Sequence, residues 1–386
     1  MNSDISAHRL QPSRGLMASR KLRVALVAPS LHILGGQAVQ ADELLRAWRT
    51  DPDVEAWLVP INPPYTGWLG KPSRVPYIRT ILTQLKYWPL LNRELRRADV
   101  VHVFSASYFS FLLAPLPAVM VARLLGKPVL VNYRSGQAPD HLGRSSLARF
   151  VLSNTSANVV PSKYLVDVFK RLGLRALVVH NIVDTTRFKF RRRDPLRPKL
   201  LSARNLEPLY NVECTLRAFR IVQDQYPHAT LTVVGEGTEA RHLRKLAHTL
   251  DLRVEFVGKV AHDEIAPYFD RADIYLQTPN IDNMPVSVLE AFASGLPVVS
   301  TNAGGVPYIV DDGVQGLLAP VGDHAAVARQ VLRILEEPGL SDRLTTAALR
   351  GCALYSWSTV RDQWMSVYLD AIRPGRGEAA RELAAS

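Results

Sequence analysis

Short, unbroken runs of apolar residues, separated by amphipathic segments, constrain the fold of this chain more than any other feature. They occur in two successive series, and most are rich in β-branched residues. Such runs predict strands buried on both faces, as in a parallel sheet covered by helices. The first series is Leu22–Ala28, Val54–Val59, Val100–Phe104, Pro128–Tyr133, Ala157–Pro161 and Ala176–His180. The second series is Lys199–Arg204, Ala229–Gly235, Arg253–Gly258, Ala272–Gln277, Leu296–Thr301 and Gly316–Pro320.

A charged segment that contains prolines, Phe188–Lys199, separates the two series and is typical of a linker. The sequence therefore predicts an α/β protein with two doubly wound, Rossmann-like domains that face each other across a cleft. Ligands of open parallel sheets bind at the carboxyl ends of the strands, which makes the cleft the expected site. The expected ranges are 21–182 and 183–355 for the domains, 356–372 for a helix that crosses back to the N-terminal domain, 1–20 for a disordered tail and 373–386 for a second tail.

The net charge of +12 lies entirely in the N-terminal part of the chain. Residues 1–182 contain 23 Lys and Arg against 10 Asp and Glu, whereas residues 183–386 contain 24 and 25. The segment 71–97 has seven basic residues, one acidic residue and interleaved aromatic side chains. A basic amphipathic helix of this kind can lie on an anionic membrane surface; the alternative is a solvated helix whose apolar face packs on the sheet. Nucleic acid is not an expected partner, because no nucleic-acid-binding motif is present.

Several classes of protein are excluded by the sequence. Two cysteines cannot form a disulfide framework, and no Cys or His spacing fits a zinc site. The acidic pair Asp51-Pro52-Asp53 falls in an expected turn, so no metal is expected. The N-terminal residues lack the apolar core of a secretory signal, and the apolar segment Tyr108–Ala122 is too short to span a membrane and more typical of a buried helix. We expect a cytoplasmic protein that is peripheral at the inner face of the membrane if segment 71–97 binds lipid.

The segment Asn280–Pro320 carries the strongest chemical signal. Asp282 can cap a helix that begins near Met284 or Pro285, and the free N–H groups at such a helix start can hold a diphosphate. Glu290 lies about two turns further, in an apolar helix, where a carboxylate needs a partner. A sugar diol supplies two donors to a carboxylate; the alternative places Glu290 on a solvated helix face.

Two glycine pairs lie between an expected strand and the following helix. They are Gly35-Gly36 in the first domain and Gly304-Gly305 in the second. Glycine lets the backbone approach a phosphate closely, although either pair can also be a plain tight turn.

Taken together, these motifs resemble the family 4 glycosyltransferases, which are retaining enzymes of the GT-B fold that use nucleotide sugars. The resemblance covers most of residues 22–372 and is tightest in 200–320. The resembling segments are Val159–Phe169, Val178–Phe188, Val233–Gly237, Phe256–Val260 and Asp282–Pro320.

The resemblance implies a donor site in the second domain and an acceptor site in the first. Asp282 and Glu290 match the two acids of the family's Glu-x7-Glu motif, so Asp282 would touch the donor sugar and Glu290 the ribose diol. The remaining implied donor-binding residues are Gly35, Gly36, Arg204, Lys259, Val260, Asn283, Met284, Pro285, Val286, Gly304 and Gly305.

The chain departs from the family pattern at two functional positions. Arg204 matches the Arg of a basic pair that neutralises the diphosphate, but Tyr210 and Asn211 stand where the Lys is expected. Arg134 stands where a His near the reacting sugar is expected. Arginine cannot act as a base, but transfer on one face of the sugar depends on positioning and electrostatics, with the leaving phosphate deprotonating the acceptor.

The implied catalytic residues are Asp282, Arg134 and His102. For His102 the alternative is a satisfied histidine at a strand end. Asp140 and His141 are further polar candidates near Arg134.

The resemblance thus implies a retaining glycosyltransferase of the hexosyltransferase type, with a nucleotide-diphosphate sugar as donor, a glycan or lipid-linked acceptor and no cofactor. Its expected role is cell-surface polysaccharide or glycolipid assembly. Two alternatives stay open: a catalytically weak relative that serves as a binding subunit, suggested by the missing Lys and His, and a nucleotide-sugar epimerase on the same fold.

Overall fold

The computed structural model describes residues 20–30, 36–63, 76–105, 107–184 and 187–373. Their strands form two six-stranded sheets in which every pair is parallel. The first sheet contains β1 (Leu22–Ala28), β2 (Val54–Pro60), β3 (Val100–Ser105), β4 (Val129–Tyr133), β5 (Ala157–Val160) and β6 (Leu177–Val178). The second contains β7 (Lys199–Ala203), β8 (Thr230–Val234), β9 (Val254–Gly258), β10 (Ile274–Gln277), β11 (Val298–Thr301) and β12 (Leu317–Ala319).

Both sheets are doubly wound, with strand orders β2-β1-β3-β4-β5-β6 and β12-β11-β10-β7-β8-β9. The predicted α/β fold is confirmed, and each predicted apolar run overlaps one of these strands, with β2 and β3 extending one residue further than expected. The helices beside the first sheet are α1 (Gly36–Arg49), α2 (Pro76–Leu95), α3 (Phe109–Leu113), α4 (Pro115–Leu124), α5 (Ala138–Arg144), α6 (Ser146–Ser153) and α7 (Lys163–Arg171). Those that follow β7 are α8 (Val212–Gln225), α9 (Ala240–Thr249), α10 (Ala266–Arg271), α11 (Val286–Ala293), α12 (His324–Glu336), α13 (Leu340–Gly351) and α14 (Trp357–Ile372).

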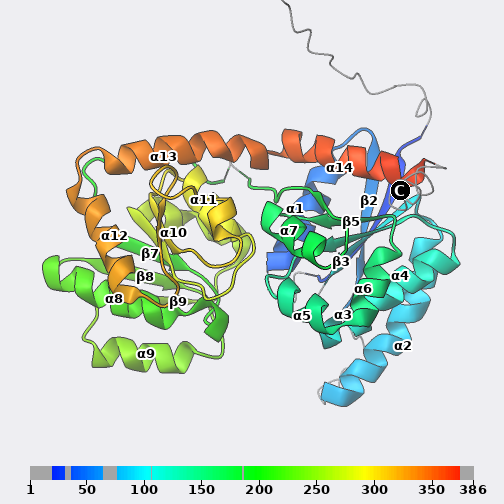
Figure 1. Ribbon diagram of the computed structural model, residues 1–386, viewed down its shortest axis with the longest axis horizontal. Coiled ribbons are helices and arrows are strands. Elements are labelled where there is room, and N and C mark those ends of the chain that lie inside the picture. Colours follow the sequence, from blue (N-terminus) through cyan, green and yellow to red (C-terminus); the bar gives the residue numbers. More distant parts are fainter. Residues whose placement is uncertain (1–19, 31–35, 64–75, 106, 185–186, 374–386) are drawn as a thin grey trace, which may run out of the picture.

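The last helix, α14, lies against the first sheet, and Figure 1 shows α13 and α14 running along one side of both domains. Trp364 and Tyr368 of α14 are buried in the same apolar cluster as Trp48 of α1. The carboxylates of Asp51 and Asp53 both pair with Arg361 of α14, at 2.5 and 2.6 Å. The acidic pair in the turn before β2 therefore holds the C-terminal helix.

The segment Tyr108–Ala122 forms two helices, α3 and α4, where the sequence suggested one. Pro115 explains the break, because proline lacks an N–H and disfavours the helical conformation of the residue before it. That residue, Ala114, has φ −128° and ψ −64° and ends α3. Within the described residues, no helix is both long enough and apolar enough to cross a membrane.

The basic segment 71–97 contains α2, while residues 71–75 lie outside the described part of the chain. One face of α2 packs on the sheet through the buried side chains of Tyr87, Leu91 and Leu95. Ile81 and Leu85 point away from that core, with 62% and 67% of their surface exposed. The helix therefore has a packed face and a second, exposed face that also carries apolar groups.

Candidate active site

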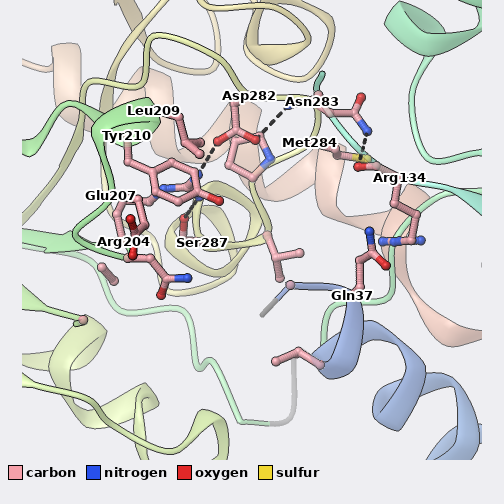
Figure 2. A pocket seen from close by; sticks show the side chains of 18 of the residues that line it. Gln37, Arg134, Arg204, Glu207, Leu209, Tyr210, Asp282, Asn283, Met284 and Ser287 are labelled. Atoms are coloured by element: carbon pink, nitrogen blue, oxygen red, sulfur yellow. Dashed lines mark hydrogen bonds and ion pairs between the residues drawn. The ribbon is translucent and has the colours of Figure 1, made fainter. Parts of the chain in front are cut away.

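A cavity of about 790 Å³ lies between the two domains. Its walls are the loops that follow the carboxyl ends of the strands, as expected for open parallel sheets. Figure 2 shows Gln37 and Arg134 on one side, with Arg204, Tyr210, Asp282 and Ser287 on the other. Most of the predicted donor-binding residues line this one cavity: Gly36, Arg204, Lys259, Val260, Asn283, Met284, Pro285, Val286 and Glu290.

Arg204, the first residue after β7, forms a buried ion pair with Asp282, and its Nη1 donates to Oγ of Ser287 over 3.3 Å. The ring of Tyr210 lies against the guanidinium, with the ring centroid 4.1 Å from Cζ. Burial raises the pKa of the Asp282 carboxyl, and the positive charge of Arg204 opposes that rise. The position where the family's Lys is expected is thus occupied by an aromatic ring that stacks on the remaining cation.

Helix α11 begins one or two residues later than expected, at Val286, and Asp282 does not cap it. Pro285 is the N-cap residue and gives no side-chain hydrogen bond to the helix. The Asp282 carboxylate is already engaged, since it pairs with Arg204 and accepts the N–H of Asn283 over 2.8 Å.

Glu290 is 4% exposed and has a protein partner, His262, which the sequence did not single out. Burial alone would lower the pKa of His262, but hydrogen bonds to the carboxylates of Glu290 and Glu43 outweigh it and raise that pKa to about 9. Arg187 adds a positive charge, with Nη1 at 3.3 Å from Oε1 of Glu43 and Nη2 at 3.1 Å from the carbonyl oxygen of His262. His262 therefore joins Glu43 of the first domain to Glu290 of the second.

The segment Asn283–Met284 contacts the first domain directly. Oγ of Ser162 donates to Oδ1 of Asn283 over 2.5 Å, and Nδ2 of Asn283 donates to the carbonyl oxygen of Arg134 over 3.3 Å. Nδ2 of Asn181 lies 3.5 Å from the carbonyl oxygen of Met284. These contacts fix the floor of the cavity where the two domains meet.

Gly304 and Gly305 do not line the cavity, which corrects the expectation that they contact a phosphate. A Cβ atom on Gly304 would lie 2.2 Å from the carbonyl oxygen of Asp282, and one on Gly305 would lie 1.9 Å from that of Asn283. The pair lets the loop after β11 pack beneath the backbone of Asp282 and Asn283. Gly35 lies outside the described residues.

Two glycines that line the cavity, Gly235 and Gly237, are missing from the predicted site residues. A Cβ on either would lie 2.1–2.3 Å from a carbonyl oxygen of the loop after β7. The signal was present in the Val233–Gly237 motif, because glycines directly after a strand point to a close backbone approach.

His102 does not reach the cavity, so it cannot touch a substrate as predicted. It is fully buried on β3, with Nδ1 2.9 Å from the Tyr368 hydroxyl and Nε2 3.1 Å from Nδ2 of Asn132. Burial and the nearby charge of Arg134 lower its pKa to about 3, so the ring is neutral. It is the satisfied core histidine of the alternative interpretation.

Asp140 and His141 are absent from the cavity wall as well. Asp140 pairs with Arg144 at 2.7 Å, and Nδ1 of His141 lies 2.8 Å from the Tyr133 hydroxyl. In the part of the chain that the structure describes, no group of three or more His, Cys, Asp or Glu side chains is placed to hold a metal ion.

Comparisons with known proteins agree with this arrangement. Residues 34–187 match the family "Glycosyltransferase Family 4", and residues 184–350 match "Glycosyl transferases group 1". The chain is 30% identical to a glycogen synthase of Mycobacterium tuberculosis over 72% of this chain and 70% of that one. It is 25% identical to a phosphatidyl-myo-inositol mannosyltransferase of Mycobacterium leprae over 90% and 96%.

Two solved structures have a similar fold. Anabaena HepE in complex with UDP-glucose superposes with a TM-score of 0.71 at 18% identity, over 89% of this chain and 98% of that one. Sucrose-phosphate synthase from Thermosynechococcus elongatus has a TM-score of 0.71 at 19% identity, over 95% and 100%.

Proposed function

This chain belongs to the family 4 glycosyltransferases, and we propose that it is a retaining enzyme that moves a sugar from a nucleotide-diphosphate donor to a glycan or lipid-linked acceptor. Its glycosyltransferase class and its GT-B fold follow from the family. The glycosyltransferase class therefore excludes the epimerase alternative. The absence of the family's Lys is expected to affect the rate of transfer and not the class of reaction. The observation that carries the proposal is that Arg204, Glu290 and the start of α11 share one cavity.

The donor nucleotide is proposed to lie on the wall formed by the second domain. Glu290 accepts the two hydroxyls of the ribose, because a carboxylate binds a diol with both oxygens. Gly235 and Gly237 let the loop after β7 pack closely at this wall of the cavity, and Lys259 and Val260 are proposed to lie beside the nucleobase. The complex of HepE with UDP-glucose, a protein of the same fold, supports a nucleotide sugar as the ligand.

The diphosphate is proposed to lie between Arg204 and the free N–H groups at the start of α11. The helix dipole and the guanidinium both favour negative charge there. Tyr210 stands in place of the second cation, so Arg204 is proposed to neutralise the leaving diphosphate. The positive charge of Arg204 is shared between the diphosphate and the carboxylate of Asp282. No metal or other cofactor is needed for this role in the proposed mechanism.

The transfer step is proposed to take place on one face of the sugar. Such a step asks the protein for orientation and charge stabilisation, while the leaving phosphate accepts the proton of the attacking hydroxyl. Asp282, which is held by Arg204 and by the Asn283 N–H, is proposed to fix the sugar. Transfer of a labelled sugar to the acceptor, followed by NMR assignment of the new anomeric centre, tests this mechanism, and inversion at that centre would contradict it.

The acceptor is proposed to reach the site from a membrane surface. Exposed apolar side chains lie on three helices, α2, its neighbour α4, and α3. Leu124 of α4 is 81% exposed. Arg93, Arg96 and Arg97 add positive charge at the end of α2, which anionic lipids attract. The related mannosyltransferase, whose name gives phosphatidyl-myo-inositol as its acceptor, supports a lipid-linked acceptor and a role in glycolipid or polysaccharide assembly.

A further inference from the structure

Arg134 is a half-buried cation that has no counter-ion among the described residues. It follows β4 directly, lines the cavity, and belongs to the wall that faces Arg204 (Figure 2). Its Nη2 donates to Oδ1 of Asn181, and its Nη1 lies 3.5 Å from Oδ1 of Asn132. Among the described residues no carboxylate pairs with it. Burial lowers the pKa of the guanidinium to about 10, so it still carries its charge at neutral pH.

Other buried or half-buried arginines of this chain have a carboxylate partner or several backbone carbonyl partners, although Nε of Arg187 and of Arg204 has no hydrogen-bond partner among the described residues. Arg204 pairs with Asp282, and Arg187 with Glu43. Arg193 has no carboxylate within hydrogen-bond distance but gives its donors to four backbone carbonyl groups. Arg134 uses two of the five N–H donors of a guanidinium, and both go to neutral amides. A charge that is partly removed from water costs free energy unless it is paired, so the half-buried guanidinium of Arg134 favours an anion from outside the chain.

A hydrogen-bonded chain of neutral side chains holds Arg134 in place. Because Oδ1 of Asn132 faces the guanidinium, its Nδ2 faces His102 and donates to Nε2 of that ring. The His102 proton must then be on Nδ1, which donates to the hydroxyl of Tyr368 on α14. The network adds no negative charge to the site. It orients the cation and leaves its charge uncompensated.

The place of Arg134 indicates which part of a substrate it meets. Its own carbonyl oxygen accepts the side-chain amide of Asn283, and a Cβ on Gly136 of the same loop would lie 3.2 Å from the backbone of Asp282. In the proposed function Asp282 contacts the sugar, whereas the diphosphate is held by Arg204 and α11. Arg134 therefore lies nearer to the sugar than to the diphosphate, which rests on that proposed function.

We propose that Arg134 binds an acidic group, a carboxylate or a phosphate, that belongs to the transferred sugar or to the acceptor and lies outside the donor's diphosphate. A planar guanidinium binds either group with two parallel hydrogen bonds. The chain therefore selects a charged sugar or a charged acceptor over its neutral counterpart, and Arg134 is the residue that makes the selection.

Calorimetric titration of the full chain tests the proposal in two arms. The donor arm compares UDP, UDP-glucose and UDP-glucuronate, and GDP, GDP-mannose and GDP-mannuronate. The acceptor arm compares a polyprenyl diphosphate-linked glucose with octyl glucoside. The variants are Arg134→Gln and Arg134→Lys, with Arg144→Gln, which removes an exposed arginine of α5, as the control for net charge.

In one arm the acidic ligand should bind the wild-type protein more tightly than the neutral ligand, and Arg134→Gln should reduce its affinity about 10- to 100-fold. The arm that responds identifies the sugar or the acceptor as the source of the acid. Arg134→Lys should recover part of the loss, and Arg144→Gln should show none.

The proposal is overturned if Arg134→Gln weakens UDP or GDP as much as it weakens the acidic ligands, since Arg134 would then be a ligand of the diphosphate. It is also overturned if neither arm distinguishes charged from neutral ligands. Failure of the wild-type protein to bind any nucleotide would contradict the proposed function instead, and the acceptor arm would still decide the role of Arg134.

Discussion

Nε2 of His262 lies 2.8 Å from Oε1 of Glu290, and the same ring approaches a carboxylate of the other domain. Nδ1 of His262 is 3.4 Å from Glu43 and 3.0 Å from Nη2 of Arg187. With two carboxylates facing the ring, the protonated form is favoured, and Arg187 then bonds to Glu43 and to the His262 carbonyl oxygen. The residue proposed to hold the ribose is thus part of a charged cluster that ties the domains together.

This cluster predicts a pH dependence of stability. The pKa of His262 is about 9 in the folded protein and about 6.5 in an unfolded chain. A raised folded pKa means that the stabilisation is complete below about pH 6.5 and disappears as the pH rises through about 9. Urea unfolding should therefore show wild type more stable than His262→Gln at pH 6, with the difference shrinking towards pH 10.

His242→Gln is the matched control, because His242 pairs with Glu213 at an exposed site and surface pairs contribute at most about 1 kcal/mol. A difference between wild type and His262→Gln that stays constant from pH 6 to pH 10 would contradict the assignment of His262.

A side chain at position 305 should displace the backbone of the cavity wall at Asn283. In Gly305→Ala the new methyl group would lie 1.9 Å from the carbonyl oxygen of Asn283, so the backbone of that loop must move. We expect a destabilisation of about 1–3 kcal/mol and weaker donor binding. Gly143→Ala, on α5, meets no atom within 4 Å and should be close to neutral in thermal unfolding. Equal stability of the two variants would contradict the close packing of Gly305 against the backbone of Asn283.

Replacing Tyr210 by lysine should restore the positive charge that the family's Lys supplies. Tyr210→Lys adds a second positive charge beside the diphosphate but removes the ring that stacks on Arg204. We expect a higher kcat, since one charge-assisted contact supplies about 1.5–3 kcal/mol, together with a lower Tm. Tyr210→Met removes the ring without adding charge, so it should show the lower Tm alone. A kcat for Tyr210→Lys no higher than that of Tyr210→Met would argue against a role for charge at this position.

The exposed apolar side chains of the first domain predict binding to anionic vesicles. Wild type should sediment with vesicles that contain phosphatidylglycerol, and less so in high salt, because salt screens the basic residues. Leu85→Glu, on the exposed face of α2, should reduce binding. Val314→Glu, at an exposed apolar position of the second domain, should leave it unchanged. An equal effect of both variants would mean that α2 does not contact the lipid.

The sequence predicts the strands and the donor half of the cavity well, because both depend on local patterns. Apolar runs identify strands, and residues of the loops that follow strands, such as Arg204 and Asp282, meet at one edge of a sheet. The partners of those residues could not be predicted from the sequence. His262 finds Glu290 only through the fold, and Gly305 lies beneath Asn283 rather than beside a ligand. His102 was misassigned because it was expected near the end of its strand, whereas β3 continues to Ser105 and buries the His102 side chain.

The central claim is that a nucleotide-diphosphate donor binds in this cavity with its ribose on Glu290. Calorimetric titration of UDP, GDP and ADP into wild type, Glu290→Ala and Glu264→Ala tests it most directly; Glu264 is an exposed acid two residues from His262. The account predicts that wild type binds at least one nucleotide, that Glu290→Ala weakens it at least about tenfold, and that Glu264→Ala leaves it unchanged. Unchanged binding by Glu290→Ala would contradict the account.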